Sequence, residues 1–94
     1  TEAYLERITT LDDQLDAFVT RTADVALEQA RNAEAAIARG ERRGPLHGIP
    51  YGLKDVFETA GIRTTAQSRI LQDYVPATSA TAARKLADAG AVLL

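Results

Sequence analysis

Residues 44–57 read Gly44-Pro45-Leu46-His47-Gly48-Ile49-Pro50-Tyr51-Gly52-Leu53-Lys54-Asp55-Val56-Phe57. Apolar residues surround Lys54, and the stretch predicts a largely buried strand over residues 49–56. Alternation along a strand places Tyr51 and Leu53 on one face, and Gly52 and Lys54 on the other. Because Gly52 has no side chain, another group can approach the lysine on that face. The stretch therefore predicts a strand that carries a lysine beside an open position.

The choice of lysine at this position invites a chemical interpretation. Lys54 is one of only two lysines among the 11 basic residues of the chain. Burial removes water from an ammonium group and favours its neutral form, so a buried lysine can act as a base, whereas arginine stays protonated. The alternative is structural, because most lysines near strand ends extend their ammonium group into water. The local sequence leaves both interpretations open.

Other polar residues of this region are predicted to have structural roles. His47 has no serine or cysteine nearby as an obvious partner, which favours a loop histidine without a catalytic role. Asp55 should face away from Lys54 and anchor backbone groups after the strand. Ser79 is predicted to cap a following helix. The residues therefore supply a candidate base but no nucleophile.

Hydrophobic periodicity predicts three helices, over residues 2–10, 23–39 and 80–89. Short runs of β-branched and aromatic or aliphatic residues predict three strands, over residues 17–20, over residues 49–56 and from Ala91 onward. Residues 62–78 are polar and irregular, and they either line a site or form a surface loop. The order helix-strand-helix-strand-helix-strand is typical of an α/β fold.

Composition excludes several classes of function. The chain has 94 residues, of which 46% are apolar and 26% charged, as in a globular domain or a piece of one. A net charge of −2 argues against direct nucleic-acid binding, and no apolar run approaches the length of a membrane span. With no cysteine and one histidine, neither a metal nor another cofactor is expected. The start is unlike a signal peptide, and we expect a cytoplasmic protein.

Three ordered motifs resemble those of the amidase signature family. They are the run from Gly44 to Asp55, the run from Thr59 to Ser68, and the segment from Asp73 to Leu94. The match is continuous from about Gly44 to Leu94. Two positions depart from the family pattern, since Gln67 and Ser79 stand where glycine and aspartate are frequent. The resemblance implies the N-terminal part of an amidase-signature fold, a mixed sheet flanked by helices.

The resemblance also implies a mechanism. The family hydrolyses or transfers amides with a Ser–Ser–Lys triad, in which one serine attacks, the second relays a proton and the lysine is the base. Lys54 falls on the position of that lysine. Both serines of the family lie in a glycine- and serine-rich segment that these residues do not include. We therefore expect residues 1–94 to be the N-terminal fragment of a single amidase domain, inactive by itself.

Several alternatives stay open at this stage. The full-length protein is expected to act either as a stand-alone amidase on a small amide, or in the family's glutamyl-tRNA amidotransferase branch, which releases ammonia from glutamine for a partner subunit. Its partners would then be amidotransferase subunits or a second copy of the chain. A different class of function is a non-catalytic α/β structural or interaction module. That class would be favoured if the continuation of the chain lacked the two serines.

Overall fold

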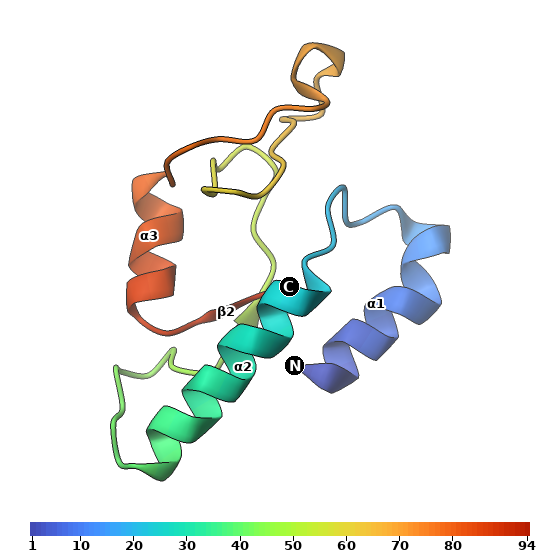
Figure 1. Ribbon diagram of the computed structural model, residues 1–94. Helices are drawn as coiled ribbons and strands as arrows, with labels where there is room; N and C mark the ends of the chain where they lie inside the picture. Colours follow the sequence, from blue (N-terminus) through green and yellow to red (C-terminus); the bar gives the residue numbers. More distant parts are fainter.

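A computed structural model describes residues 1–94 (Figure 1). Its elements are α1 (Glu2–Leu15), α2 (Ala23–Ala38), β1 (Pro50–Tyr51), a 3₁₀ turn η1 (Arg69–Leu71), α3 (Thr81–Asp88) and β2 (Val92–Leu93). Helix α2 packs against β2, and α1 and α3 lie on either side of α2 in the view of Figure 1. The helices therefore flank a short strand pair, as in an α/β arrangement.

The two strands are parallel, with Pro50 opposite Val92 and Tyr51 opposite Leu93. Parallel strands need a crossover connection, and α3 lies within the one between them. On the side of β2 away from β1, the side chains of α2 and its N-cap bind the backbone of Leu93. Gln29 Oε1 accepts a hydrogen bond from the Leu93 N–H at 2.8 Å, and the Thr22 hydroxyl donates to the Leu93 carbonyl at 3.2 Å. Helix α2 is thereby fixed to the strand.

Small residues make the core between α2 and β2. The alanine stripe of α2 is buried at Ala26, Ala33 and Ala36, and Val92 of β2 is fully buried. Alanine side chains allow a helix to approach a strand closely, so a few apolar residues exclude water there. The predicted helix over residues 23–39 and the predicted strand from Ala91 are confirmed in type and position.

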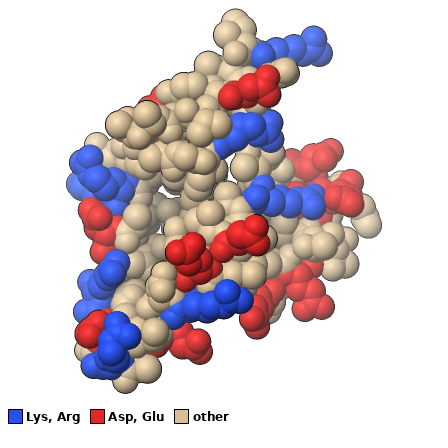
Figure 2. All heavy atoms as spheres, in the orientation of Figure 1, with Lys and Arg blue, Asp and Glu red and all other residues tan.

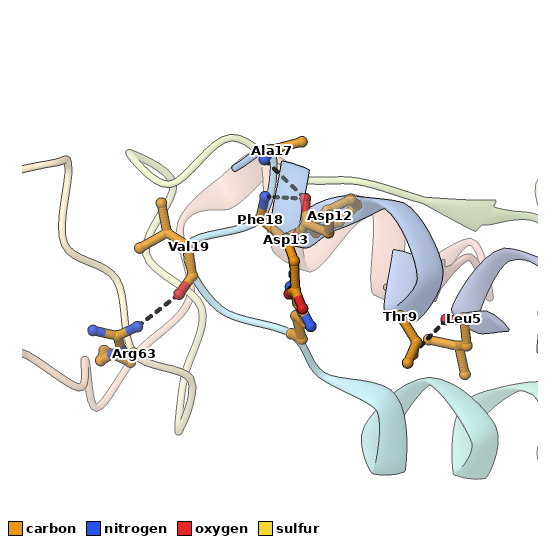
Figure 3. Close-up of polar contacts among 9 residues, drawn as sticks. Leu5, Thr9, Asp12, Asp13, Ala17, Phe18, Val19 and Arg63 are labelled. Atoms are coloured by element: carbon orange, nitrogen blue, oxygen red, sulfur yellow. Dashed lines mark hydrogen bonds and ion pairs between the residues drawn. The ribbon is translucent and has the colours of Figure 1, made fainter. Parts of the chain in front are cut away.

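The predicted strand over residues 17–20 is wrong, because this segment is irregular. The predicted end of the first helix near residue 10 is also wrong, since α1 continues to Leu15. Asp12 explains the first difference. Its carboxylate is 3% exposed and accepts hydrogen bonds from the N–H groups of Ala17 at 2.8 Å and Phe18 at 3.2 Å (Figure 3). A carboxylate on the helix therefore supplies the acceptor that a partner strand would have supplied.

Two further predictions need correction. The predicted strand over residues 49–56 shortens to Pro50–Tyr51, because only these residues find a partner in β2. Ser79 does not cap α3: the N-cap residue is Ala80, and the Ser79 hydroxyl accepts a hydrogen bond from the Ala60 N–H at 2.9 Å. The serine thus joins the start of α3 to a loop that lies 19 residues earlier in the chain.

The face drawn in Figure 2 carries charges of both signs without a large patch of either. None of the helices is long and apolar enough to cross a membrane. Several large apolar side chains are exposed, among them Ile70, which is 93% exposed. These exposed apolar side chains have little packing against the rest of the 94 residues.

Candidate active site

An open hollow of about 530 Å³ lies where four segments of the chain meet. Its lining comes from the α1–α2 connection at residues 17–22, from residues 52–57 after β1, from the loop at residues 59–67 and from Leu93 and Leu94. Strand β2 and the chain after β1 enter the hollow side by side because the two strands are parallel. The fold therefore brings together segments that are distant in the sequence.

Lys54 lines this hollow. Its ammonium group makes no ion pair and no hydrogen bond in the structure, and the residue is exposed. The predicted burial of Lys54 is wrong for these 94 residues, because β1 ends at Tyr51 and nothing covers the open side of the hollow. The chain turns directly after the lysine, whose carbonyl accepts hydrogen bonds from the N–H groups of Val56 and Phe57 at 2.8 and 3.0 Å. These hydrogen bonds fix the backbone of Lys54 at the lining of the hollow, while its ammonium group stays unpaired.

Gly52 leaves open space beside the chain that carries Lys54, as its lack of a side chain predicts. The nearest atom to a Cβ placed at Gly52 would be Cε1 of Phe18, at 4.0 Å. The aromatic ring therefore lies just across from the glycine and contributes an apolar wall to the hollow. No pattern in the sequence indicates this contact, because the residues around Phe18 predict a strand.

Arg63 holds the α1–α2 connection in place from the loop at residues 59–67. Its Nη2 donates to the Val19 carbonyl at 2.6 Å (Figure 3). Its Nη1 donates to the Gln72 carbonyl at 3.2 Å. The Thr20 hydroxyl donates to the Arg63 carbonyl at 3.3 Å. This role of Arg63 was not predicted, since one arginine in a polar loop has no pattern that distinguishes it from a solvated surface cation.

Asp55 anchors the loop that follows, and this prediction is confirmed. Its carboxylate accepts hydrogen bonds from the Thr65 hydroxyl, from the Thr65 N–H at 2.8 Å and from the Gln67 N–H at 3.4 Å. Its carbonyl accepts from the Ala66 N–H at 2.7 Å. Burial alone would raise the pKa of Asp55, but the hydrogen bonds from Thr65 and Gln67 and the charge of Arg63 outweigh it and hold that pKa below its ordinary value. Asp55 and Lys54 form no ion pair, as expected.

Replacing Asp55 with asparagine should lower the free energy of unfolding of the full-length protein by about 1–3 kcal/mol at neutral pH, because charged hydrogen-bond acceptors are lost. A depressed folded-state pKa stabilises the fold above the ordinary pKa near 3.8, and this stabilisation is lost as the pH falls through the lower folded-state value. The difference between wild type and Asp55→Asn, measured by urea unfolding, should therefore shrink below about pH 4. Asp88→Asn, at an exposed position without side-chain bonds, is the control. A difference that is the same at pH 7 and pH 3 would contradict the assignment.

His47 is buried, with 5% of its surface exposed, and its Nδ1 accepts a hydrogen bond from the Arg43 N–H at 3.2 Å. Its ring lies against Gly90, whose φ of +78° only glycine adopts easily. This environment matches the structural role predicted for His47. No group of three or more histidine, cysteine, aspartate or glutamate side chains is placed to hold a metal ion.

The comparisons with known proteins agree with the motifs around Lys54. A family model described as Amidase matches residues 1–94. The chain therefore belongs to the amidase signature family. The A subunit of the glutamyl-tRNA(Gln) amidotransferase of Moorella thermoacetica is 52% identical over 94 residues, which are 100% of this chain and 19% of that relative.

Solved structures give the same result for the fold. The native peptide amidase of Stenotrophomonas maltophilia superposes with a TM-score of 0.91 at 43% sequence identity, over 99% of this chain and 19% of that chain. A protein of a vestigial complex, described for the evolutionary origins of an s-triazine catabolic enzyme, superposes with a TM-score of 0.91 at 36% identity, over 99% of this chain and 21% of that one. The chain thus spans about a fifth of the length of the proteins it resembles.

Proposed function

We propose that the full-length protein hydrolyses or transfers an amide bond, and that Lys54 is the base of its Ser–Ser–Lys triad. One observation carries the proposal: Lys54 lines the hollow beside a glycine that leaves room for a reacting group, and its ammonium group makes no ion pair. Lys85 is also exposed and without a side-chain partner, but it does not line the hollow, so the position of Lys54 beside Gly52 distinguishes the two lysines. Membership of the amidase family supports the same role.

The proposed chemistry begins with a serine hydroxyl, which attacks the carbonyl carbon of the amide. The proton of that hydroxyl passes to a second serine, while the second serine passes its own proton to the neutral amine of Lys54. The C–N bond then breaks as the leaving nitrogen takes a proton back, and water or another acceptor releases the acyl group from the first serine. The base must be neutral at the start, and arginine could not replace it.

The remainder of this active site is proposed to lie in a longer chain. Both serines would come from residues outside the 94, and the same residues would close the open side of the hollow and desolvate Lys54. The substrate is proposed to be a small amide or glutamine. Amidotransferase subunits are proposed as partners, because the relative from Moorella thermoacetica is named as such a subunit. We place this protein in the cytoplasm as part of the same proposal.

The test compares ammonia release from glutamine and from small primary amides by the full-length protein and by the 94-residue chain. The full-length protein should turn over at least one amide, and the 94-residue chain none, because it has the base without the nucleophile. Turnover by the 94-residue chain would contradict the assignment of the serines to other residues. If the full-length protein bound partner proteins but released no ammonia from any amide, the non-catalytic α/β module would be the better interpretation.

A further inference from the structure

A strained turn lines the same hollow as Lys54. It runs from Thr65 to Ser68 and is closed by the Ser68 N–H, which donates to the Thr65 carbonyl at 2.8 Å. Its two central residues, Ala66 and Gln67, have φ values of +49° and +56°. Turns with both central residues at positive φ are dominated by glycine, asparagine and aspartate, because other side chains crowd the backbone there.

This strain is maintained by hydrogen bonds from a neighbour of the lysine. Asp55 accepts from the N–H groups of Ala66 and Gln67, through its carbonyl and its carboxylate respectively, and also from Thr65. The Thr65 hydroxyl oxygen accepts a further hydrogen bond from the Gln67 N–H at 3.1 Å. The backbone of Gln67 is therefore fixed relative to the peptide that carries Lys54. Strained backbone that is held in this way is concentrated at functional sites.

The side chain of Gln67 has no structural role of its own. Gln67 lines the hollow together with Lys54, and its carboxamide makes no hydrogen bond in the structure. Glycine would satisfy the backbone geometry of this position with less strain. Gln67 is exposed, so an exposed polar residue stands in a strained position at the lining of the hollow, and no hydrogen bond of its side chain compensates for the strain.

We infer that Gln67 is a specificity-determining residue, whose carboxamide hydrogen-bonds the polar end of an amide substrate while the reacting end lies toward Lys54. This inference rests on the proposed amidase function and narrows its substrate class to amides that carry hydrogen-bonding groups away from the reacting carbon. Glutamine has such groups, whereas pentanamide has the same carbon skeleton and the same reacting amide without them. The ratio of kcat/KM for these two substrates therefore measures the contribution of Gln67.

The experiment compares Gln67→Gly with Ala66→Gly in the full-length protein. Both variants relieve positive-φ strain, and each should raise the midpoint of thermal unfolding by about 2 °C. Only Gln67→Gly removes a carboxamide. It should lower the ratio of kcat/KM for glutamine over pentanamide by about three- to tenfold, the effect of one hydrogen bond, mainly through KM for glutamine. Ala66→Gly should leave the ratio unchanged.

The outcomes separate this inference from the function on which it rests. If wild type releases ammonia from either amide but Gln67→Gly keeps the wild-type ratio, Gln67 does not determine specificity and the amidase function stands. An equal change of the ratio in both glycine variants would assign the effect to the turn backbone and would also overturn the inference. If wild type releases ammonia from no amide, the proposed function fails and the role of Gln67 fails with it.

Discussion

Replacing Lys54 with arginine in the full-length protein is expected to lower kcat/KM for ammonia release by about 10²–10⁴-fold, the usual contribution of a general base. Arginine keeps the positive charge and most of the length of the side chain, but it cannot become neutral and accept the serine proton. Lys54→Ala should lose activity to a similar extent. Because the ammonium group of Lys54 has no partner among residues 1–94, neither change should remove a side-chain hydrogen bond or ion pair that these residues need for folding.

The matched control for this experiment is the second lysine of the chain. Lys85 is exposed on α3 and does not line the hollow, so Lys85→Arg and Lys85→Ala should keep the wild-type rate. Circular dichroism of every variant tests that the fold is retained. Near-normal turnover by Lys54→Arg would mean that Lys54 acts only as a cation, and the proposed mechanism would then be wrong.

Replacing Gly90 with alanine should lower the free energy of unfolding by about 3–5 kcal/mol, which is a large part of the stability of a typical domain. A Cβ at this position would lie 2.4 Å from Cδ2 of the buried His47 ring. The ring cannot move away easily, because it is buried and bound to the Arg43 N–H. A shift of residue 90 would also disturb the sheet. The Gly90 carbonyl accepts a hydrogen bond at 2.8 Å from the N–H of Gly48, which lies two residues before β1.

Gly61→Ala is the matched control for the clash between a Cβ at residue 90 and the His47 ring. Gly61 has a φ of +75°, close to that of Gly90, but a Cβ placed there would have no atom within 4 Å. The free energy of unfolding of Gly61→Ala, measured in urea, should therefore fall only by the cost of backbone strain, about 1–2 kcal/mol. Adding His47→Ala to Gly90→Ala should recover part of the lost stability, because the clash disappears. Equal effects of Gly61→Ala and Gly90→Ala would show that the His47 contact is not a constraint on residue 90.

Prediction from the sequence succeeded where local pattern and short-range geometry decide the structure. The alanine stripe over residues 23–39 indicated the correct helix, and the open space at Gly52 was expected from its missing side chain. Prediction failed where a distant side chain intervenes. Residues 17–20 have strand-forming side chains, but Asp12 and Arg63 bind their backbone and keep them irregular.

The burial of Lys54 could not be predicted from its neighbours in the sequence. Apolar residues on both sides of a lysine indicate an apolar environment, but burial depends on what covers the side chain from other parts of the fold. In the structure, β1 is two residues long and one side of the hollow is open. The same limit applies to Ser79, whose capping geometry was plausible locally but whose hydroxyl binds the distant Ala60.

The way α2 binds β2 also affects aggregation. An exposed strand edge can template the addition of a strand from another molecule, through its free N–H and carbonyl groups. At Leu93 both groups are already occupied, by Gln29 and Thr22. On β1, Pro50 has no N–H to donate. At Leu93 and Pro50, the two-stranded sheet therefore offers few free backbone groups to a strand from another molecule, and this protects it against edge-to-edge association.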